Sequence, residues 1–354
     1  MDFDFAAEGP KFAMLLYGLV AFVVVVGGLL LILDGIPSLL ARRRERRELA
    51  LAAVGGAVAL GPGRRRNWEW LMAAGFLFPA GLLLLIGVVI PAIRTLLLSF
   101  MDGGSTAWVG LKNYSWLFSQ SETLITLRNT LIWVVLVPLV ATTVGLVYAV
   151  LVDRARFEAV AKSLIFMPMA ISFVGASIIW KFVYAYRPEG AEQIGLLNQI
   201  WVWFGGEPKQ WLLEQGAALN TVLLLIVMIW IQAGFAMVVL SAAIKAIPAD
   251  IVEAARLDGV NAWQMFWRVT LPSIRPALIV VVVTISISTL KVFDIVRTMT
   301  NGNYDTGVVA SEMYNQAFRY GQTGQGSALA VFLFILVVPI VIFQIRNLRK
   351  QRES

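Results

Sequence analysis

Seven long apolar stretches constrain the fold of this chain more than any other feature of its sequence. A helix needs about 20 apolar residues to cross roughly 30 Å of hydrocarbon, and each stretch is close to that length or longer. Because 59% of the 354 residues are hydrophobic and only 14% are charged, a soluble domain could not bury this much apolar surface. The sequence therefore predicts an all-α polytopic membrane protein with about seven transmembrane helices. The predicted spans cover residues 12–33, 69–98, 129–152, 159–184, 218–245, 274–296 and 328–346.

Lys and Arg residues concentrate in alternate loops between these spans. The loops at 34–68, 153–162 and 245–275 and the C-terminal tail together hold 19 basic residues, against seven in the opposite segments. Cytoplasmic loops of membrane proteins carry the excess of basic residues, so the N-terminus is predicted outside and the C-terminus in the cytoplasm. This topology explains the net charge of +7, and nucleic acid is not a predicted partner.

The first 68 residues are predicted to form a separate N-terminal region. Asp2, Asp4 and Glu8 precede the first apolar stretch, where a signal peptide would carry positive charges, so this stretch is predicted to be a retained helix. Residues 49–61 are apolar but too short to span, and their basic flanks favour an interfacial segment over an eighth span. Residues 1–68 are therefore predicted to be a transmembrane helix with a basic cytoplasmic linker, and residues 69–354 the main core.

Proline recurs inside the predicted spans, among other positions at Pro79, Pro91, Pro138 and Pro168. Each removes a helical hydrogen bond and favours a kink, which suits helices that move around a pore. The alternative is that they are ordinary, because proline is common in membrane helices.

The residue types that are absent exclude most catalytic chemistry. The chain has no Cys and no His, which removes disulfides, thiolate nucleophiles, Cys/His metal sites and any Ser-His-Asp triad. It also lacks a GxxxxGK[ST] segment, so it has no P-loop with which to bind ATP phosphates. The sequence thus predicts a non-enzyme without a cofactor of its own, in which any use of ATP depends on a partner.

The most informative segment is the predicted cytoplasmic loop that runs from Glu253-Ala254-Ala255 through Gly259 to Leu271-Pro272. Apolar residues recur in it at helical spacing and are interrupted by Gly259, which predicts two short helices meeting at this glycine. The loop resembles the EAA loop of ABC importer permeases in both spacing and predicted side. An interfacial amphipathic helix anchored by Trp263 and Trp267 is the alternative.

This resemblance implies a type I ABC importer permease fold in which the loop forms cytoplasmic coupling helices, and it makes residues 69–354 the permease core. It also implies partners: a second homologous permease, two ATPase subunits that bind ATP and Mg, and an extracytoplasmic sugar-binding protein. The expected location is the cytoplasmic (inner) membrane of a bacterium or archaeon, within the lipid bilayer. The residues implied to couple to the ATPase are Glu253, Ala254, Ala255, Asp258, Gly259, Leu271 and Pro272.

Further segments resemble sugar-importing permeases. Lys245-Ala246-Ile247-Pro248 and Thr300-Asn301-Gly302 are similar to the maltose type, and residues 162–176 and 291–296 to its alpha-glucoside branch. The resemblance implies import of a sugar such as maltose, trehalose or sucrose. The alternative is a secondary transporter driven by an ion gradient, for which Lys291 and Asp294 are the only hint of a charged relay.

A polar stripe in the span after the loop predicts where a sugar is bound. Thr284, Ser288 and Lys291 are spaced to share one helical face, and Gln232 and Phe235 lie in the preceding span. In the maltose type the sugar contacts come from these same two helices, which implies a substrate-binding role for all five residues. Alternatively, the two hydroxyls bond the carbonyl one turn back, and Lys291 pairs with Asp294.

The outer loops near 185–217, with Trp201, Trp203 and Trp211, and near 300–327 are predicted to face the binding protein. Anchoring of these tryptophans at the membrane interface is the alternative.

Overall fold

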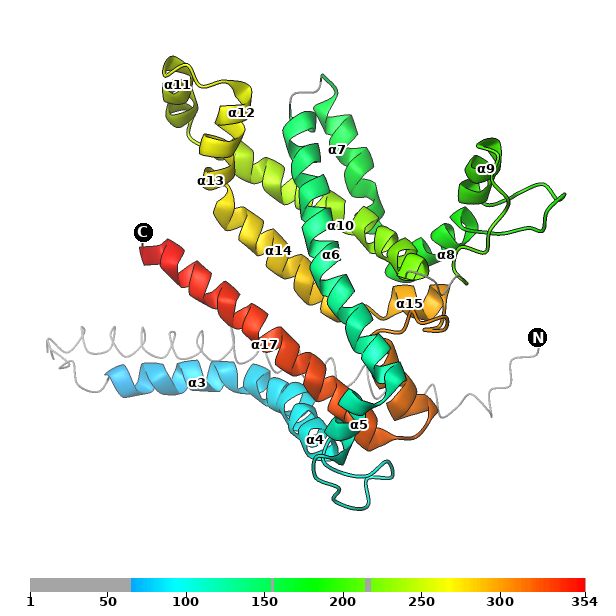
Figure 1. Cartoon of the computed structure of the whole chain (residues 1–354). Helices are drawn as coiled ribbons and strands as arrows, with labels where there is room; N and C mark the ends of the chain where they lie inside the picture. Colours follow the sequence, from blue (N-terminus) through cyan, green and yellow to red (C-terminus); the bar gives the residue numbers. More distant parts are fainter. Residues whose placement is uncertain (1–64, 154–155, 214–217, 354) are drawn as a thin grey trace, which may run out of the picture. The chain divides into compact units, whose positions relative to one another are not determined.

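The computed structural model describes residues 65–153, 156–213 and 218–353 (Figure 1). The chain separates into two compact units, Met1–Ile93 and Arg94–Ser354. Apart from an isolated β-bridge between Met101 and Trp108, every regular element in the described residues is helical. The predicted helix at 12–33 and the predicted interfacial segment at 49–61 lie outside the described residues.

The described part of the first unit is one hydrophobic helical segment. It consists of α3 (Arg65–Leu84), a π-helical turn η2 (Leu85–Val89) and the beginning of α4 (Ile90–Leu98). Residues Ala74–Leu98 are long and apolar enough to cross a membrane, as predicted. Pro91 is the second residue of α4, just after the π-helical turn, whereas Pro79 lies within the uninterrupted α3. The predicted boundary at residues 68 and 69 falls inside α3.

The second unit is built around two helices, α6 (Ser121–Val152) and α10 (Leu219–Lys245), which pack closely against each other (Figure 1). Small residues allow their backbones to approach, because a Cβ atom on Gly145 would lie 2.8 Å from the backbone nitrogen of Met237. The predicted span at 218–245 agrees with α10 to within one residue, whereas the predicted span at 129–152 begins eight residues after the start of α6. The largest fully buried side chains of the pair include Trp133, Val137, Leu224, Met228, Met237 and Leu240.

Two of the predicted spans are not single straight helices. The stretch predicted at 159–184 forms α7 (Glu158–Phe166), a 3-10 turn η3 (Met167–Ala170) and α8 (Phe173–Val183), with a bend of 103°. Pro168 lies in the 3-10 turn, and the Ser172 hydroxyl restarts the helix by accepting the Gly175 N–H at 3.1 Å. The kink predicted at Pro168 is therefore present, whereas Pro138 lies inside the unbroken α6.

The stretch predicted at 274–296 also differs from a single helix. Helix α14 covers Arg275–Leu290, and the chain turns before a short helix α15 (Asp294–Met299) begins. The Val292 N–H donates to the carbonyl of Thr289, three residues back, which closes a turn and ends the regular ladder. On its other side α14 joins the helical stretch Ala262–Ser273 at an angle of 68°.

The last helices form the remainder of the second unit. Helix α17 (Thr323–Glu353) packs against α14, α5 (Lys112–Ser119), α16 (Val309–Tyr314) and the π-helical turn η6 (Asn315–Arg319). Leu117, Val309 and Leu329 form a small core among them. The C-terminal end of α17 lies toward the beginning of α14, so these two helices are antiparallel (Figure 1).

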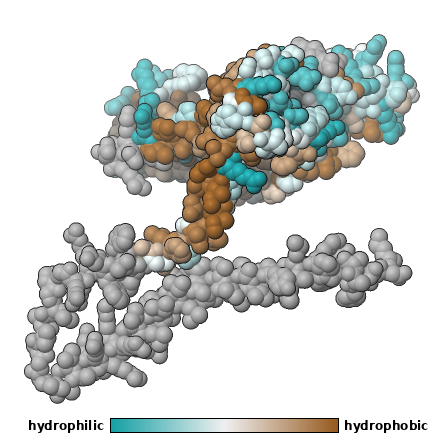
Figure 2. All heavy atoms as spheres, turned by 90° about the horizontal axis from the view of Figure 1, so that it is seen from below, coloured by the Kyte–Doolittle hydropathy of each residue, from teal (hydrophilic) through white to brown (hydrophobic). Residues whose placement is uncertain are grey.

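Four helices of the described residues are long and apolar enough to cross a membrane, or six spans if each bent pair counts as one. Figure 2 shows brown hydrophobic residues over much of the visible surface, with teal hydrophilic residues gathered in separate areas. Six spans fit the prediction of an all-α polytopic protein with about seven, because the predicted span at 12–33 lies outside the described residues.

Candidate functional site

The loop after α10 contains the two short helices that its glycine predicted. Helix α11 (Ala249–Leu257) ends where Gly259 takes a φ of +73°, a left-handed conformation that glycine adopts without strain. The Gly259 N–H donates to the Arg256 carbonyl at 3.0 Å and the Val260 N–H to the Ala255 carbonyl at 3.2 Å. This pair of bonds is a Schellman motif, which satisfies the last carbonyls of α11.

The second half of the loop starts from an N-cap. Asn261 accepts the Gln264 N–H at 2.8 Å, and the Gln264 side chain accepts the Asn261 N–H at 3.0 Å. This capping box begins α12 (Ala262–Gln264), which continues through the π-helical turn η5 (Met265–Thr270) into α13 (Leu271–Ser273). Leu271 is half-buried and Pro272 exposed, directly before the bend that leads into α14.

Most of the loop surface is exposed in this subunit. Glu253, Ala254 and Asp258 are exposed, and Leu257 exposes 89% of its surface. Trp263, which exposes 70%, packs edge-on against Trp267 with ring centroids 5.6 Å apart. Apolar side chains this accessible require a partner protein or lipid headgroups to cover them.

The base of the loop borders a cavity of about 310 Å³. Ile247, Pro248 and Ile251 line one side of it, while Ile274 and Ala277 line the other. The loop therefore connects to the ends of both α10 and α14, so a displacement of α11 would reach both helices.

The predicted sugar-binding residues lie on α10 and α14, which contact each other and both pack against α6. Gln232 is buried, with 9% of its surface exposed, and its side chain makes no hydrogen bond with any described residue. Phe235 is half-buried and packs against the main core. Lys291 is exposed and caps the end of α14, so it does not continue the helical face of Thr284 and Ser288 as predicted.

The hydroxyls of α14 divide into two kinds. Ser286 and Thr289 are buried and donate to the carbonyls of Val282 and Ile285, one turn back, at 2.8 and 2.7 Å. Thr284 and Ser288 are half-buried, and within the described residues their hydroxyls have no hydrogen-bond partner. Bonding to the carbonyl one turn back is therefore found for Ser286 and Thr289 and not for Thr284 and Ser288, the hydroxyls predicted to bind the sugar. The alternative pairing of Lys291 with Asp294 is not among the ion pairs of the described chain, because the helix ends between them.

The loop around α9 (Leu196–Trp203), predicted to face outward, is held by one buried side chain. The Asn198 amide donates to the carbonyls of Ala185 and Lys209, and its oxygen accepts the N–H groups of Lys209 and Trp211. On this fixed scaffold Trp203 exposes 74% of its surface and Phe204 86%. Two large aromatic side chains are thus presented to a partner or to the membrane interface.

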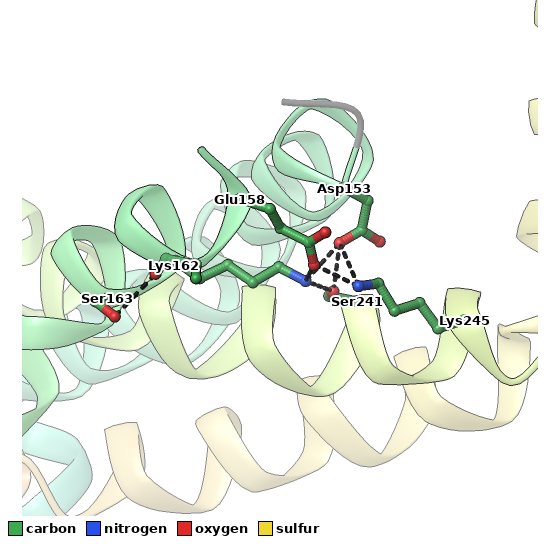
Figure 3. Close-up of polar contacts among 7 residues, drawn as sticks. Asp153, Glu158, Lys162, Ser163, Ser241 and Lys245 are labelled. Carbon is green, nitrogen blue, oxygen red and sulfur yellow. Dashed lines mark hydrogen bonds and ion pairs between the residues drawn. The ribbon is translucent and has the colours of Figure 1, made fainter. Parts of the chain in front are cut away.

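Sequence reasoning missed a cluster of charges where α6, α7 and α10 meet (Figure 3). Lys162 lies 2.5 Å from Asp153 and 2.8 Å from Glu158, and Lys245 also pairs with Glu158. The Ser241 hydroxyl donates to Asp153 at 2.7 Å. No ion pair was predicted for either lysine, although the i, i+4 spacing of Glu158 and Lys162 was an available signal. These five residues are called the ion-pair cluster below.

Apolar helices of membrane-spanning length and an exposed helical loop define a membrane protein whose loop requires a covering partner. The family model described as binding-protein-dependent transport system inner membrane component matches residues 124–352, more than half of the chain. The chain therefore belongs to this family, whose members are permease subunits of ABC importers. This membership overturns the secondary-transporter alternative.

Named relatives match the chain over most of its length. The osmoprotective compounds uptake permease protein GgtC of Synechocystis is 53% identical over 78% of this chain and 99% of its own. The alpha-glucoside transport system permease protein AglF of Rhizobium meliloti is 48% identical over 78% of this chain and 82% of its own. A chain of a bacterial ABC transporter that imports alginate superposes with a TM-score of 0.69 at 22% identity, covering 81% of this chain and 99% of that one. The structural likeness shows a shared fold.

Proposed function

We propose that this permease subunit carries an alpha-glucoside or an osmoprotective compound into the cytoplasm. The names of the two relatives above support this class of substrate. In the proposed assembly the chain pairs with a second homologous permease, two ATPase subunits bind ATP and Mg, and an extracytoplasmic binding protein delivers the sugar. The N-terminus lies outside and the C-terminus in the cytoplasm, and residues 1–68 form an added helix and linker before the permease core at 69–354.

The observation that carries the sugar assignment is the pair of unbonded hydroxyls on α14. A hydroxyl in a membrane helix ordinarily bonds the carbonyl one turn back, as Ser286 and Thr289 do. Thr284 and Ser288 keep their hydrogen-bonding capacity for another group, and a sugar offers hydroxyls that both donate and accept. Gln232 and Phe235 on α10 add an unbonded amide and an aromatic face, and Lys291 at the end of α14 adds a charged donor.

The EAA loop is proposed as the contact with the ATPase. Glu253, Ala254 and Asp258 are exposed together with Leu257 and Trp263, and this mixed small, acidic and apolar surface fits a groove on a protein. Closure of the ATPase pair would displace α11 and switch the pore between inward and outward access. Transport is coupled to hydrolysis because each ligand prefers one of these conformations.

The outer loop is proposed to contact the binding protein. Trp203 and Phe204 are exposed aromatic side chains on a loop that Asn198 holds in place, which lowers the entropy lost on binding. Substitution of both by serine is expected to weaken stimulation of the ATPase by loaded binding protein. Unchanged stimulation would instead favour an interfacial anchor.

The deciding experiment is reconstitution of the complete transporter in proteoliposomes. ATPase activity and uptake are measured with and without binding protein, using maltose, trehalose and sucrose. The expected result is hydrolysis stimulated only by sugar-loaded binding protein, with uptake of the same sugar. Stimulation by none of the three would contradict the alpha-glucoside assignment, and uptake that follows an ion gradient without ATP would contradict the coupling mechanism.

A further inference from the structure

The ion-pair cluster connects three helices at a single point. Asp153 follows the last residue of α6, Glu158 and Lys162 lie on α7, and Ser241 and Lys245 lie in the last two turns of α10 (Figure 3). Lys162 contacts Asp153, Glu158 and Ser241 at once, so it lies at the centre of the cluster. Lys245 contacts Glu158 and lies 4.0 Å from Asp153. Two carboxylates and two ammonium groups leave the cluster without net charge.

The shielded half of the cluster depends on Lys162. The side chain of Asp153 exposes 12% of its surface and that of Lys162 21%, whereas that of Lys245 exposes 53%. The second carboxylate oxygen of Asp153 is buried and accepts no hydrogen bond from the described residues. Removal of Lys162 would therefore leave a largely buried carboxylate with only Ser241 and the distant Lys245, which is far more costly than loss of a surface pair.

The cluster lies next to the connection from α10 to the EAA loop. Only Ala246, Ile247 and Pro248 separate Lys245 from the first residue of α11. This connection is hydrogen-bonded, because the Ala246 N–H donates to Ala242 and the Ile247 N–H to Ile244. A displacement of α11 therefore reaches Lys245 through a short and ordered segment.

The three helices also approach each other closely farther along α10. A Cβ atom on Gly234 would lie 2.6 Å from the Ile165 carbonyl oxygen of α7, and one on Gly145 of α6 would lie 2.4 Å from the Ala236 Cβ of α10. These close contacts fix α6, α7 and α10 to one another at a second level. With the ion-pair cluster at their ends, the three helices are attached at two separated places.

We propose that the ion-pair cluster makes the ends of α6, α7 and α10 move as one body when the ATPase displaces the EAA loop. Asp153, Glu158, Lys162 and Lys245 are then positioning residues for coupling, and the inference rests on the proposed role of that loop. In this mechanism the cluster stays closed throughout the transport cycle. Without it, the end of α10 moves apart from the ends of α6 and α7, and hydrolysis no longer moves the pore.

The first test compares Lys162→Met with Lys162→Arg in the complete reconstituted transporter. Sugar transported per ATP hydrolysed should fall at least about fivefold for the methionine variant, the lower end of ordinary coupling effects. The arginine variant keeps a cation within reach of both carboxylates and should preserve the ratio. Lys112→Met is the matched control, because Lys112 is exposed and makes no ion pair with any described residue. A folded Lys162→Met transporter with the ratio of the unaltered protein would refute the proposal.

A second test does not depend on a buried substitution. The chain has no cysteine, so Glu158→Cys with Lys245→Cys introduces its only two thiols. With cysteine-free partners, a short bis-methanethiosulfonate reagent links them reversibly. The unlinked variant should lose coupling, the linked one should regain it, and reduction should abolish it again. Arrest of transport on linking would show that the cluster must open, which overturns the proposal, as would full coupling without the link.

The Gly259→Val variant distinguishes failure of the proposed EAA-loop role from failure of the proposed role of the ion-pair cluster. If the EAA loop does not couple to an ATPase, the Gly259→Val transporter keeps its full ratio of sugar to ATP. If only the role of the ion-pair cluster is wrong, Gly259→Val uncouples transport while the cluster variants remain coupled.

Discussion

The α6–α10 pair and the EAA loop are neighbours in the chain but are opposite kinds of surface. Gly145, Ala236 and Met237 bring the two long helices to backbone contact, and Leu240 near the end of α10 is fully buried. Seventeen positions later Leu257 exposes 89% of its surface. The pair is a completed interior, whereas the loop is an exposed surface that we propose binds the ATPase.

This difference shows where each kind of substitution should act. In the pair, a change of volume meets fixed atoms and is expressed as a loss of stability. In the loop, the same change meets open space, so it should leave stability unchanged and alter binding of the ATPase or coupling of hydrolysis to uptake. The predictions below test this separation.

The largest effect is expected from Gly145→Leu. Its Cβ alone would lie 2.4 Å from the Ala236 Cβ and 2.9 Å from the Ala233 carbonyl oxygen, so the helices must separate. Overpacking of this kind destabilises by about 3 kcal/mol or more, which should abolish a cooperative thermal transition of the purified subunit. Gly81→Leu is the control, because nothing lies within 4 Å of a Cβ atom at that position of α3. A normal transition for Gly145→Leu would show that the pair is loosely packed.

Gly259→Val should have the next largest effect, and a different one. Nothing lies within 4 Å of a Cβ there, but a φ of +73° disfavours a β-branched residue by about 1–2 kcal/mol. The α11–α12 turn should rearrange while the subunit remains folded, so ATP hydrolysis continues without uptake. Gly259→Asn tolerates the left-handed conformation and should retain coupling. Normal uptake by the valine variant would remove the loop from the mechanism.

The same contrast explains what the sequence could predict. The apolar stretches and the turn at Gly259 are local, because they depend on residues one or two helical turns apart, and both are present. The ion-pair cluster joins Lys162 to Ser241, 79 positions away, so it requires knowledge of how α7 and α10 pack.

The polar stripe was predictable only in part. Helical periodicity correctly predicted that Thr284 and Ser288 share one face of α14. It did not predict that the helix ends at Leu290, and this end removes Lys291 from that face. The bend after Pro168 had a sequence signal, whereas the turn after Leu290 depends on packing of α15 against α8 and α10. Which hydroxyls of α14 stay unbonded likewise depends on its orientation in the bundle.

Thr284→Val and Ser288→Ala should have an effect of intermediate size on transport and almost none on folding. Each removes one hydroxyl available to the sugar, which contributes about 1 kcal/mol, or about fivefold in uptake. Uptake is measured at saturating sugar-loaded binding protein, so that the permease and not the receptor is tested. Ser286→Ala is the matched control, because that hydroxyl already bonds the Val282 carbonyl. An equal loss in the control would mean that the stripe acts on helix packing.

The smallest effect on stability is expected from Leu257→Ala, and its value lies in the comparison with Leu240→Ala. The Leu240 side chain is fully buried, so its truncation should destabilise the subunit by about 2–5 kcal/mol. Truncation of Leu257 removes an almost fully exposed side chain and should change the unfolding free energy by less than about 0.5 kcal/mol. In the assembled transporter Leu257→Ala should instead weaken retention of the ATPase on purification, while Leu240→Ala should not do so beyond its loss of folded subunit. A destabilised Leu257→Ala subunit would mean that the loop is already covered within its own chain, and the separation between completed interior and open interface would then be wrong.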